Sequence, residues 1–171
     1  MLMESEFKGI SISELCRRAG VERRTFYNHY NDLYELVDEC TLDFTNLTDF
    51  LPPKVSYAKW NPKPRGKPFC LMMRENERYQ HLFFDPELKE RCIHDSLIFI
   101  LPWICFVLRR NTDLQIEEIE SFITYSFIGC FESTRRYLDC SDEEWERRKK
   151  AIDKYNMSGM KLISVLQDHK D

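Results

Sequence analysis

Residues 9–36 read GISISELCRRAGVERRTFYNHYNDLYEL, and this stretch decides the fold of the N-terminal part of the chain. Ser11 followed by Glu14 is a capping box, a pattern that satisfies free N–H groups at a helix start. Gly20 is expected to end this helix, because glycine enters the left-handed conformation without a steric penalty. Asp32, followed three residues later by a glutamate, is expected to cap another helix. The pattern predicts two short helices joined at Gly20 and a longer helix after them.

The second short helix, expected to begin at Glu22, carries residue types that suit a DNA-reading element. Phe26 and Tyr30 share an apolar side that would face a core. The polar side turns outward and holds Arg23, Arg24, Thr25, Tyr27, Asn28 and His29. Arginine and asparagine can bond bases bidentately in the major groove, whereas threonine, tyrosine and histidine commonly contact phosphates. A short helix with a solvated polar face also occurs in other helical proteins, so the pattern alone leaves both interpretations open.

The same stretch resembles the DNA-binding domain of the TetR/AcrR family of transcriptional regulators. The residues that carry the resemblance are Ile12, Glu14, Leu15, the Ala19-Gly20-Val21 turn, Thr25-Phe26-Tyr27 and His29-Tyr30. It implies an all-α, TetR-like fold, with a helix-turn-helix DNA-binding domain at residues 1–38 and a helical ligand-binding and dimerisation domain at residues 39–171. The residues that it implies at base edges are Arg23, Arg24 and Asn28, and those that it implies at phosphates are Thr25, Tyr27 and His29.

The resemblance also implies a function and its partners. A homodimer would bind a palindromic operator in double-stranded DNA and repress transcription by blocking the polymerase, although an activator uses the same geometry. A small-molecule effector would bind in a pocket of the C-terminal domain. The aromatic residues that could line this pocket are Phe99, Trp103, Phe106, Phe122 and Tyr125. Aromatic residues at helical spacing can equally form a plain core.

Three features depart from the family pattern and support an alternative. Most of the family's first helix is missing, because only residues 1–5 precede the turn. Glu22 stands where the family favours a small hydroxyl residue, and Leu33 stands where a phosphate-contacting lysine is common. The alternative is therefore a co-regulator with the TetR fold that has lost DNA binding and acts through a protein partner or a small ligand.

Composition limits the classes of protein that fit the chain. With 171 residues, of which 43% are hydrophobic, the chain is long and apolar enough to bury a core. Its net charge of −4 argues against a protein that coats nucleic acid through bulk charge. Residues 15–30 nevertheless hold four arginines against one glutamate. A local basic patch on an acidic chain suits a site-specific reader.

Catalytic, metal and membrane functions find no support in the sequence. Its seven cysteines are scattered singly, and Cys92 and His94 are a poor match to zinc spacing. We expect buried, reduced thiols in a cytoplasmic protein, with a redox sensor as the remaining option. The longest apolar run, residues 97–108, is interrupted by Pro102 and too short to span a bilayer. Four scattered histidines and the lack of a phosphate loop or nucleophile motif predict no enzyme, no cofactor and no metal.

Helical periodicity continues after the first three helices and predicts an all-α fold. The expected helices cover residues 32–50, 69–79, 87–110, 113–138 and the stretch after Ser141. Ser141 followed by Glu144 is expected to cap this last helix. The helix expected over residues 87–110 contains Pro102, which should kink or split it. Five of the seven prolines lie in residues 52–68, which predicts a loop there, with Tyr57 and Trp60 as anchors.

The last two expected helices carry more apolar surface than one neighbour can cover. Ile119, Ile123 and Phe127 belong to one stripe, while Tyr125 and Gly129 belong to a second apolar edge. Core packing within one chain is the simple explanation. In the TetR-like family, the final two helices form a four-helix dimer interface, which this pattern resembles. We therefore predict a homodimer through residues 113–168.

Overall fold

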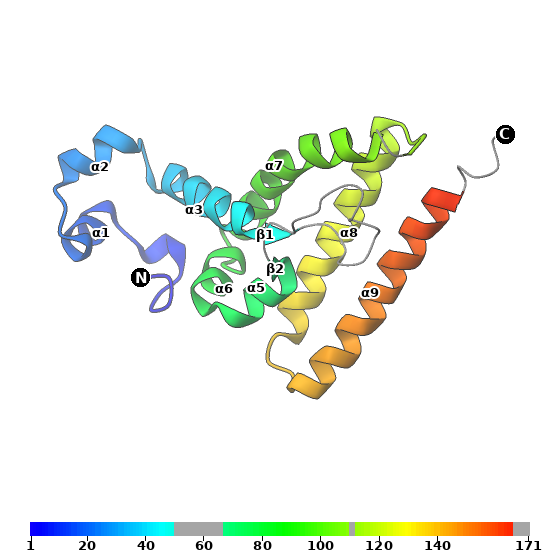
Figure 1. Cartoon of the computed structure of the whole chain (residues 1–171). Coiled ribbons are helices and arrows are strands. Elements are labelled where there is room, and N and C mark those ends of the chain that lie inside the picture. The colour runs from blue at the N-terminus through cyan, green and yellow to red at the C-terminus, as the bar shows by residue number, and fades with distance from the viewer. Residues whose placement is uncertain (50–66, 110–111, 166–171) are drawn as a thin grey trace.

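A computed structural model describes residues 1–49, 67–109 and 112–165 and shows an all-α chain (Figure 1). The elements are η1 (Phe7–Gly9), α1 (Ile12–Ala19), α2 (Arg23–His29), α3 (Leu33–Leu47), α5 (Phe69–Glu75), α6 (Glu77–Phe83), α7 (Lys89–Arg109), α8 (Ile116–Tyr137) and α9 (Asp142–Val165). Two short parallel strands, β1 (Thr48–Asp49) and β2 (Lys67–Pro68), pair Thr48 with Lys67 and Asp49 with Pro68. The expected all-α class is confirmed.

The turn between α1 and α2 forms as the sequence predicts. The Glu14 N–H donates to Oγ of Ser11 at 3.2 Å, so Ser11 caps α1. Gly20 ends the helix with φ of 68°, in the left-handed region. Half of the expected capping box is absent, since the Glu14 carboxylate accepts hydrogen bonds from Arg17 and Arg18 instead of from the Ser11 backbone.

The caps of α3 and α9 also form. The Glu35 N–H donates to Oδ1 of Asp32 at 3.0 Å, and the Glu144 N–H donates to Oγ of Ser141 at 3.3 Å. The Glu35 carboxylate accepts from the backbone N–H of Asn31 at 2.7 Å, one residue before the cap. The Glu14 and Glu35 carboxylates, which a capping box would place on the backbone N–H of the cap residue, thus accept hydrogen bonds from other donors.

The expectation of one helix over residues 69–79 was wrong. The structure has α5 and α6 there, and Asn76 separates them with φ of −133°. The Asn76 side-chain amide donates to the Met72 carbonyl at 2.9 Å, and the Gln80 amide donates to the Met73 carbonyl at 2.7 Å. These side chains satisfy carbonyls that a continuous helix would have bonded through its backbone.

Pro102 lies inside α7, which continues past it, so the expected split does not occur. Tyr57 and Trp60 of the proline-rich segment lie outside the described residues.

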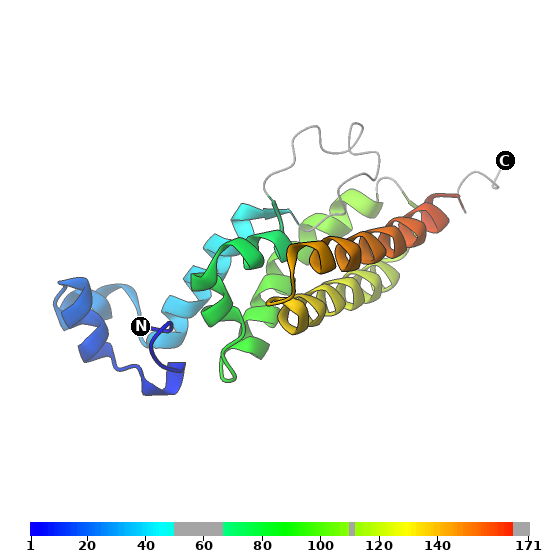
Figure 2. The same cartoon turned by 90° about the horizontal axis from the view of Figure 1, so that it is seen from below.

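Helix α3 leads from the α1–α2 end into the middle of the molecule (Figure 1). Helices α1 and α2 project at one end, and the antiparallel pair α8–α9 forms the other end, in both views (Figure 2). Helix α3 packs along α7, and α7 in turn packs on α8, while α5 and α6 fill the space beside them. The domain boundary expected at residue 38 falls inside α3. This helix therefore belongs to both the N-terminal and the C-terminal part of the chain.

Aromatic rings form the centre of the C-terminal core. Phe44 of α3 is fully buried, with its ring 5.7 Å from that of Phe69 and 4.7 Å from that of Phe83. Phe69 also stacks on Phe131 of α8, with ring centroids 5.7 Å apart. One cluster thus joins α3, α5, α6 and α8, which fixes the end of α3 that points away from α2.

Candidate nucleic-acid interface

Helix α2 presents the predicted reading residues to solvent. Its anchor is Phe26, which is 5% exposed and lies with its ring 5.4 Å from that of Tyr30. The six residues predicted to contact DNA are all exposed: Arg23, Arg24, Thr25, Tyr27, Asn28 and His29. The polar face of α2 is therefore accessible, and its direction is set by an aromatic contact on the opposite side.

Fewer of the arginines near α2 are free of carboxylate partners than the sequence indicated. Arg17 and Arg18 bond the Glu14 carboxylate at 2.6 and 2.8 Å. Arg18 also bonds Glu4 at 2.5 Å. The hydrogen bonds from Arg17 and Arg18 lower the pKa of Glu14 to about 2, so this carboxylate is ionised at neutral pH. Two of the four arginines are neutralised by partners on the protein.

Arg23 and Arg24 have different surroundings from Arg17 and Arg18. Within the described part of the chain, neither forms an ion pair with a carboxylate. The Arg23 guanidinium lies 5.9 Å from the centre of the Tyr27 ring, one turn along α2. The basic patch thus consists of two adjacent arginines at the start of α2, and one of them is oriented by an exposed tyrosine.

Two of the three departures from the family pattern, Glu22 and Leu33, have different surroundings. Glu22 occupies the cap position of α2 without a side-chain capping bond, and it is exposed beside Arg23. Leu33 is partly buried and packs against the hydrophobic core, so it is a packing residue and not a candidate for phosphate contact. A negative charge therefore stands at the edge of the polar face.

Residues 1–9 form a turn and η1 before α1. Phe7 is 6% exposed, and its ring lies 4.9 Å from that of Tyr34. The Phe7 N–H donates to Oδ2 of Asp85 at 2.8 Å, just before α7. The Tyr34 hydroxyl donates to Glu87, close to Asp85 in sequence. This segment ties the α1–α2 unit to the start of α7.

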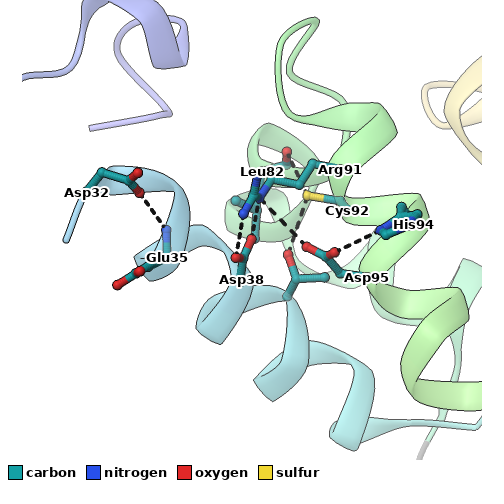
Figure 3. A network of polar contacts seen from close by, with 9 residues as sticks. Asp32, Glu35, Asp38, Leu82, Arg91, Cys92, His94 and Asp95 are labelled. Atoms are coloured by element: carbon teal, nitrogen blue, oxygen red, sulfur yellow. Dashed lines mark hydrogen bonds and ion pairs between the residues drawn. The ribbon is translucent and has the colours of Figure 1, made fainter. Parts of the chain in front are cut away.

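The contact between α3 and α7 includes a network of polar side chains, part of which Figure 3 shows. We call it the α3–α7 seam; it comprises Asp38, Thr41, Thr45, Arg91, Cys92, Asp95 and Ser96. Arg91 bonds Asp38 through two nitrogens, the second at 2.6 Å. The Thr41 hydroxyl donates to Sγ of Cys92 at 3.4 Å. The hydroxyls of Thr45 and Ser96 lie 3.3 Å apart, and both side chains are buried. Sequence reasoning missed this seam, because its residues belong to separate helices and match no motif.

The pKa values of two carboxylates of the α3–α7 seam are shifted in opposite directions. The hydrogen bonds from Arg91 lower the pKa of Asp38. Burial raises the pKa of Asp95, whose Oδ2 is buried without a hydrogen-bond partner. Oδ1 of Asp95 lies 3.2 Å from Nδ1 of His94 (Figure 3). Burial also raises the pKa of Cys92 to about 12, so this thiol is protonated and unreactive at neutral pH.

The residues expected to line an effector pocket are not gathered in the interior. Phe99, Phe106 and Tyr125 are 41%, 60% and 65% exposed. Trp103 and Phe122 are partly buried and pack against the core cluster. Three of the five side chains therefore lie at the surface of the described part of the chain. A shallow, solvent-open pocket of about 400 Å³ lies elsewhere, between η1 and the start of α3, with Phe7, Tyr34 and Glu87 in its wall.

The outer face of α8–α9 carries exposed apolar residues. The first predicted stripe is buried, with Ile119 at 0% and Phe127 at 6% exposure. The second edge is open: Tyr125 is 65% exposed, and a Cβ added to Gly129 would meet no atom within 4 Å. Tyr155 of α9 is also 65% exposed and bonds Tyr125, which raises the pKa of Tyr155.

No group of three or more histidine, cysteine, aspartate or glutamate side chains in the described part of the chain is arranged to hold a metal ion. Among the described helices, none has the length and apolar character needed to cross a membrane.

The comparisons with known proteins add no identification. No protein-family model, no curated protein and no solved structure matches this chain. The resemblance of residues 10–36 to the TetR/AcrR DNA-binding domain therefore depends on the residues themselves.

Proposed function

We propose that the protein is a TetR-like transcriptional regulator that reads double-stranded DNA with α2. The observation that carries the proposal is the exposed polar face of α2, where Arg23 and Arg24 have no carboxylate partner among the described residues. A buried phenylalanine on the opposite side orients this face. Paired arginines and an asparagine on one short helix are the residue types that bind base edges in the major groove.

The proposed active form is a homodimer that joins through the exposed edge of α8–α9. Tyr125, Gly129 and Tyr155 form an open surface on two long antiparallel helices. A two-fold dimer would present two copies of α2 to half-sites about one DNA turn, or a multiple of it, apart. The target is then a palindromic operator, and repression by blocking the polymerase is the simplest action.

The DNA proposal is tested with the intact protein and a pool of random duplexes at about 50 mM and about 200 mM salt. We expect enrichment of an inverted repeat, with weaker binding at the higher salt because phosphate contacts release counterions. Failure to retain any duplex at the lower salt would overturn the proposal.

Dimer formation has its own test. Sedimentation equilibrium at micromolar concentration should give twice the 20.7 kDa mass of one chain. A mass of one chain throughout that range would contradict the homodimer, whatever the DNA result.

A second candidate function is a co-regulator with the same fold that acts through a protein or small ligand. Glu22 on the edge of the polar face and the pairing of Arg17 and Arg18 with carboxylates favour it, because both reduce attraction to phosphates. A stable dimer that retains no duplex at low salt would support this function over the first.

A further inference from the structure

The open pocket of about 400 Å³ lies where three segments of the chain meet. Residues around η1 and the start of α1 form one wall, the first turn of α3 forms another, and Glu87 contributes from just before α7. The phenyl ring of Phe7 lies 4.9 Å from the Tyr34 ring, and the Phe7 N–H bonds Asp85. Because Phe7 belongs to the wall, the pocket exists only while residues 1–9 are packed against α3 and the start of α7.

Part of the pocket wall is apolar. Phe7 is 6% exposed, and Ile10, Ile12 and Leu33 are half-buried, so these side chains keep apolar surface that a ligand can cover. The volume lies within the range of roughly 300–1,000 Å³ that is usual for small-molecule sites. Because the pocket is open to solvent, it suits a ligand with one apolar part and one charged part that remains near water.

The charged side chains of the pocket are not balanced. Asp32 and Glu87 line it together with Lys8. Lys8 pairs with Glu6 at 3.0 Å, whereas neither Asp32 nor Glu87 forms an ion pair within the described part of the chain. Two carboxylates beside one lysine that is already paired give the pocket a negative potential, which attracts a cation.

Each of the two carboxylates is held in place through one of its oxygens. The Glu35 N–H donates to Oδ1 of Asp32 at 3.0 Å, and the Tyr34 hydroxyl donates to Oε1 of Glu87. Among the described residues, no donor bonds Oδ2 of Asp32 or Oε2 of Glu87. An ammonium group carries three N–H donors and forms strong, charge-assisted hydrogen bonds with carboxylates.

We propose that this pocket binds an aryl-alkyl ammonium compound, in which a short alkyl chain joins an aromatic ring to an ammonium group. The ring covers the apolar wall beside Phe7 and Leu33, and the ammonium group bonds Asp32 or Glu87. The site lies outside the aromatic set at Phe99–Tyr125 that was expected to bind an effector, and it does not depend on DNA reading by α2. A ligand that contacts both η1 and α3 holds residues 1–9 in place.

The test uses the intact protein without DNA, tryptamine as the probe and indole-3-propionate as its matched anion. We expect tryptamine to change the backbone amide chemical shifts of residues 7–12 and 32–34, with a Kd of about 1 mM or lower. Indole-3-propionate should cause no such changes. Equal changes with both compounds, or changes centred elsewhere, would overturn the proposal. So would the absence of changes with tryptamine at about ten times the expected Kd.

Conservative variants test the role of charge. Glu87→Gln and Asp32→Asn keep the oxygen that accepts from the protein and remove the negative charge, so each should raise the Kd for tryptamine about threefold to tenfold. Glu90→Gln is the matched control, because Glu90 is 81% exposed in α7 and does not line the pocket. Lys8→Gln should have the opposite effect and lower the Kd about twofold. An unchanged Kd in both carboxylate variants would refute the assigned ammonium site.

Hydrogen exchange gives a readout of the N-terminal segment that is separate from affinity. Opening of residues 1–9 destroys the pocket, so a bound ligand must oppose that opening. With tryptamine at about ten times its Kd, exchange at the amides of Phe7, Gly9 and Ile10 should slow about tenfold, with no change in α9. Glu87→Gln at the same concentration should show much less protection. Unchanged exchange in the wild type with the probe bound would place the ligand outside this pocket.

Discussion

The backbone N–H of Phe7 donates a 2.8 Å hydrogen bond to the carboxylate of Asp85, 78 residues further along the chain. The other carboxylate oxygen of Asp85 accepts from the N–H groups of Glu87 and Leu88, at 2.9 and 3.3 Å. One buried side chain therefore both caps the turn that leads into α7 and fastens the segment before α1.

Asp85→Asn should separate these two roles. An asparagine can keep its oxygen toward Glu87 and Leu88, but its NH₂ group then faces the Phe7 N–H, which loses its acceptor. We expect a loss of about 1–3 kcal/mol in the free energy of unfolding, measured with urea. Hydrogen exchange should increase in residues 1–10 more than in α7. The exposed Asp139→Asn serves as control and should change neither measurement.

Arg24→Ala and Arg17→Ala remove the same charge from neighbouring helices with different surroundings. If α2 reads DNA, Arg24→Ala should weaken binding to the selected operator about tenfold or more, because a base-edge contact contributes roughly 1–3 kcal/mol. Arg17→Ala should have a much smaller effect, because Glu14 already neutralises this arginine. Fluorescence anisotropy with one duplex measures both. Equal losses would show that only bulk charge matters.

Tyr155→Glu should dissociate the proposed dimer, because it places a charge at the centre of the exposed α8–α9 edge. The Kd for self-association should rise at least tenfold by sedimentation, with little change in helix content. Ile98→Glu is the matched control: Ile98 is 59% exposed on α7, outside residues 113–168. A dimer that tolerates Tyr155→Glu but not Ile98→Glu would move the interface to α7.

Asp95→Asn and Asp38→Asn should change stability in opposite directions at pH 7. The raised pKa of Asp95 means that its favourable contribution is complete below the unfolded pKa and is lost as pH rises through the folded pKa. Asp95→Asn should therefore stabilise the protein by about 1 kcal/mol at pH 7, and this gain should vanish near pH 3.

The pKa of Asp38 is lowered, so its contribution is present above the unfolded pKa and is lost as pH falls through the folded pKa. Asp38→Asn should cost up to about 1 kcal/mol at pH 7, because the pair with Arg91 is partly exposed to solvent. Urea unfolding at several pH values measures both variants. Destabilisation by both variants at pH 7 would contradict the opposite pKa shifts of the two carboxylates.

Local signals in the sequence predicted much of the fold. The caps at Ser11, Asp32 and Ser141 and the left-handed Gly20 depend on neighbouring residues alone, and all four are confirmed. The break at Asn76 was missed, because the surrounding apolar spacing is helical on both sides. Only the side-chain bonds of Asn76 and Gln80 show how the chain stops and restarts there.

Contacts between distant residues could not be predicted in this way. Helical periodicity predicts the exposed face of α2. It does not predict that Arg18, which pairs with Glu14, also forms an ion pair with Glu4. The α3–α7 seam arises only when helices far apart in sequence pack together. No spacing rule connects such residues.

The neutralisation of Arg17 and Arg18 has a kinetic consequence. With those charges cancelled and an acidic chain behind them, α2 creates only a short-range positive field. If α2 reads DNA, long-range attraction therefore contributes little to encounter. Association should then proceed at the rate of unsteered collisions, about 10⁵–10⁶ M⁻¹s⁻¹, and vary little with ionic strength. Discrimination between DNA sequences would arise after contact, in how long each complex lasts.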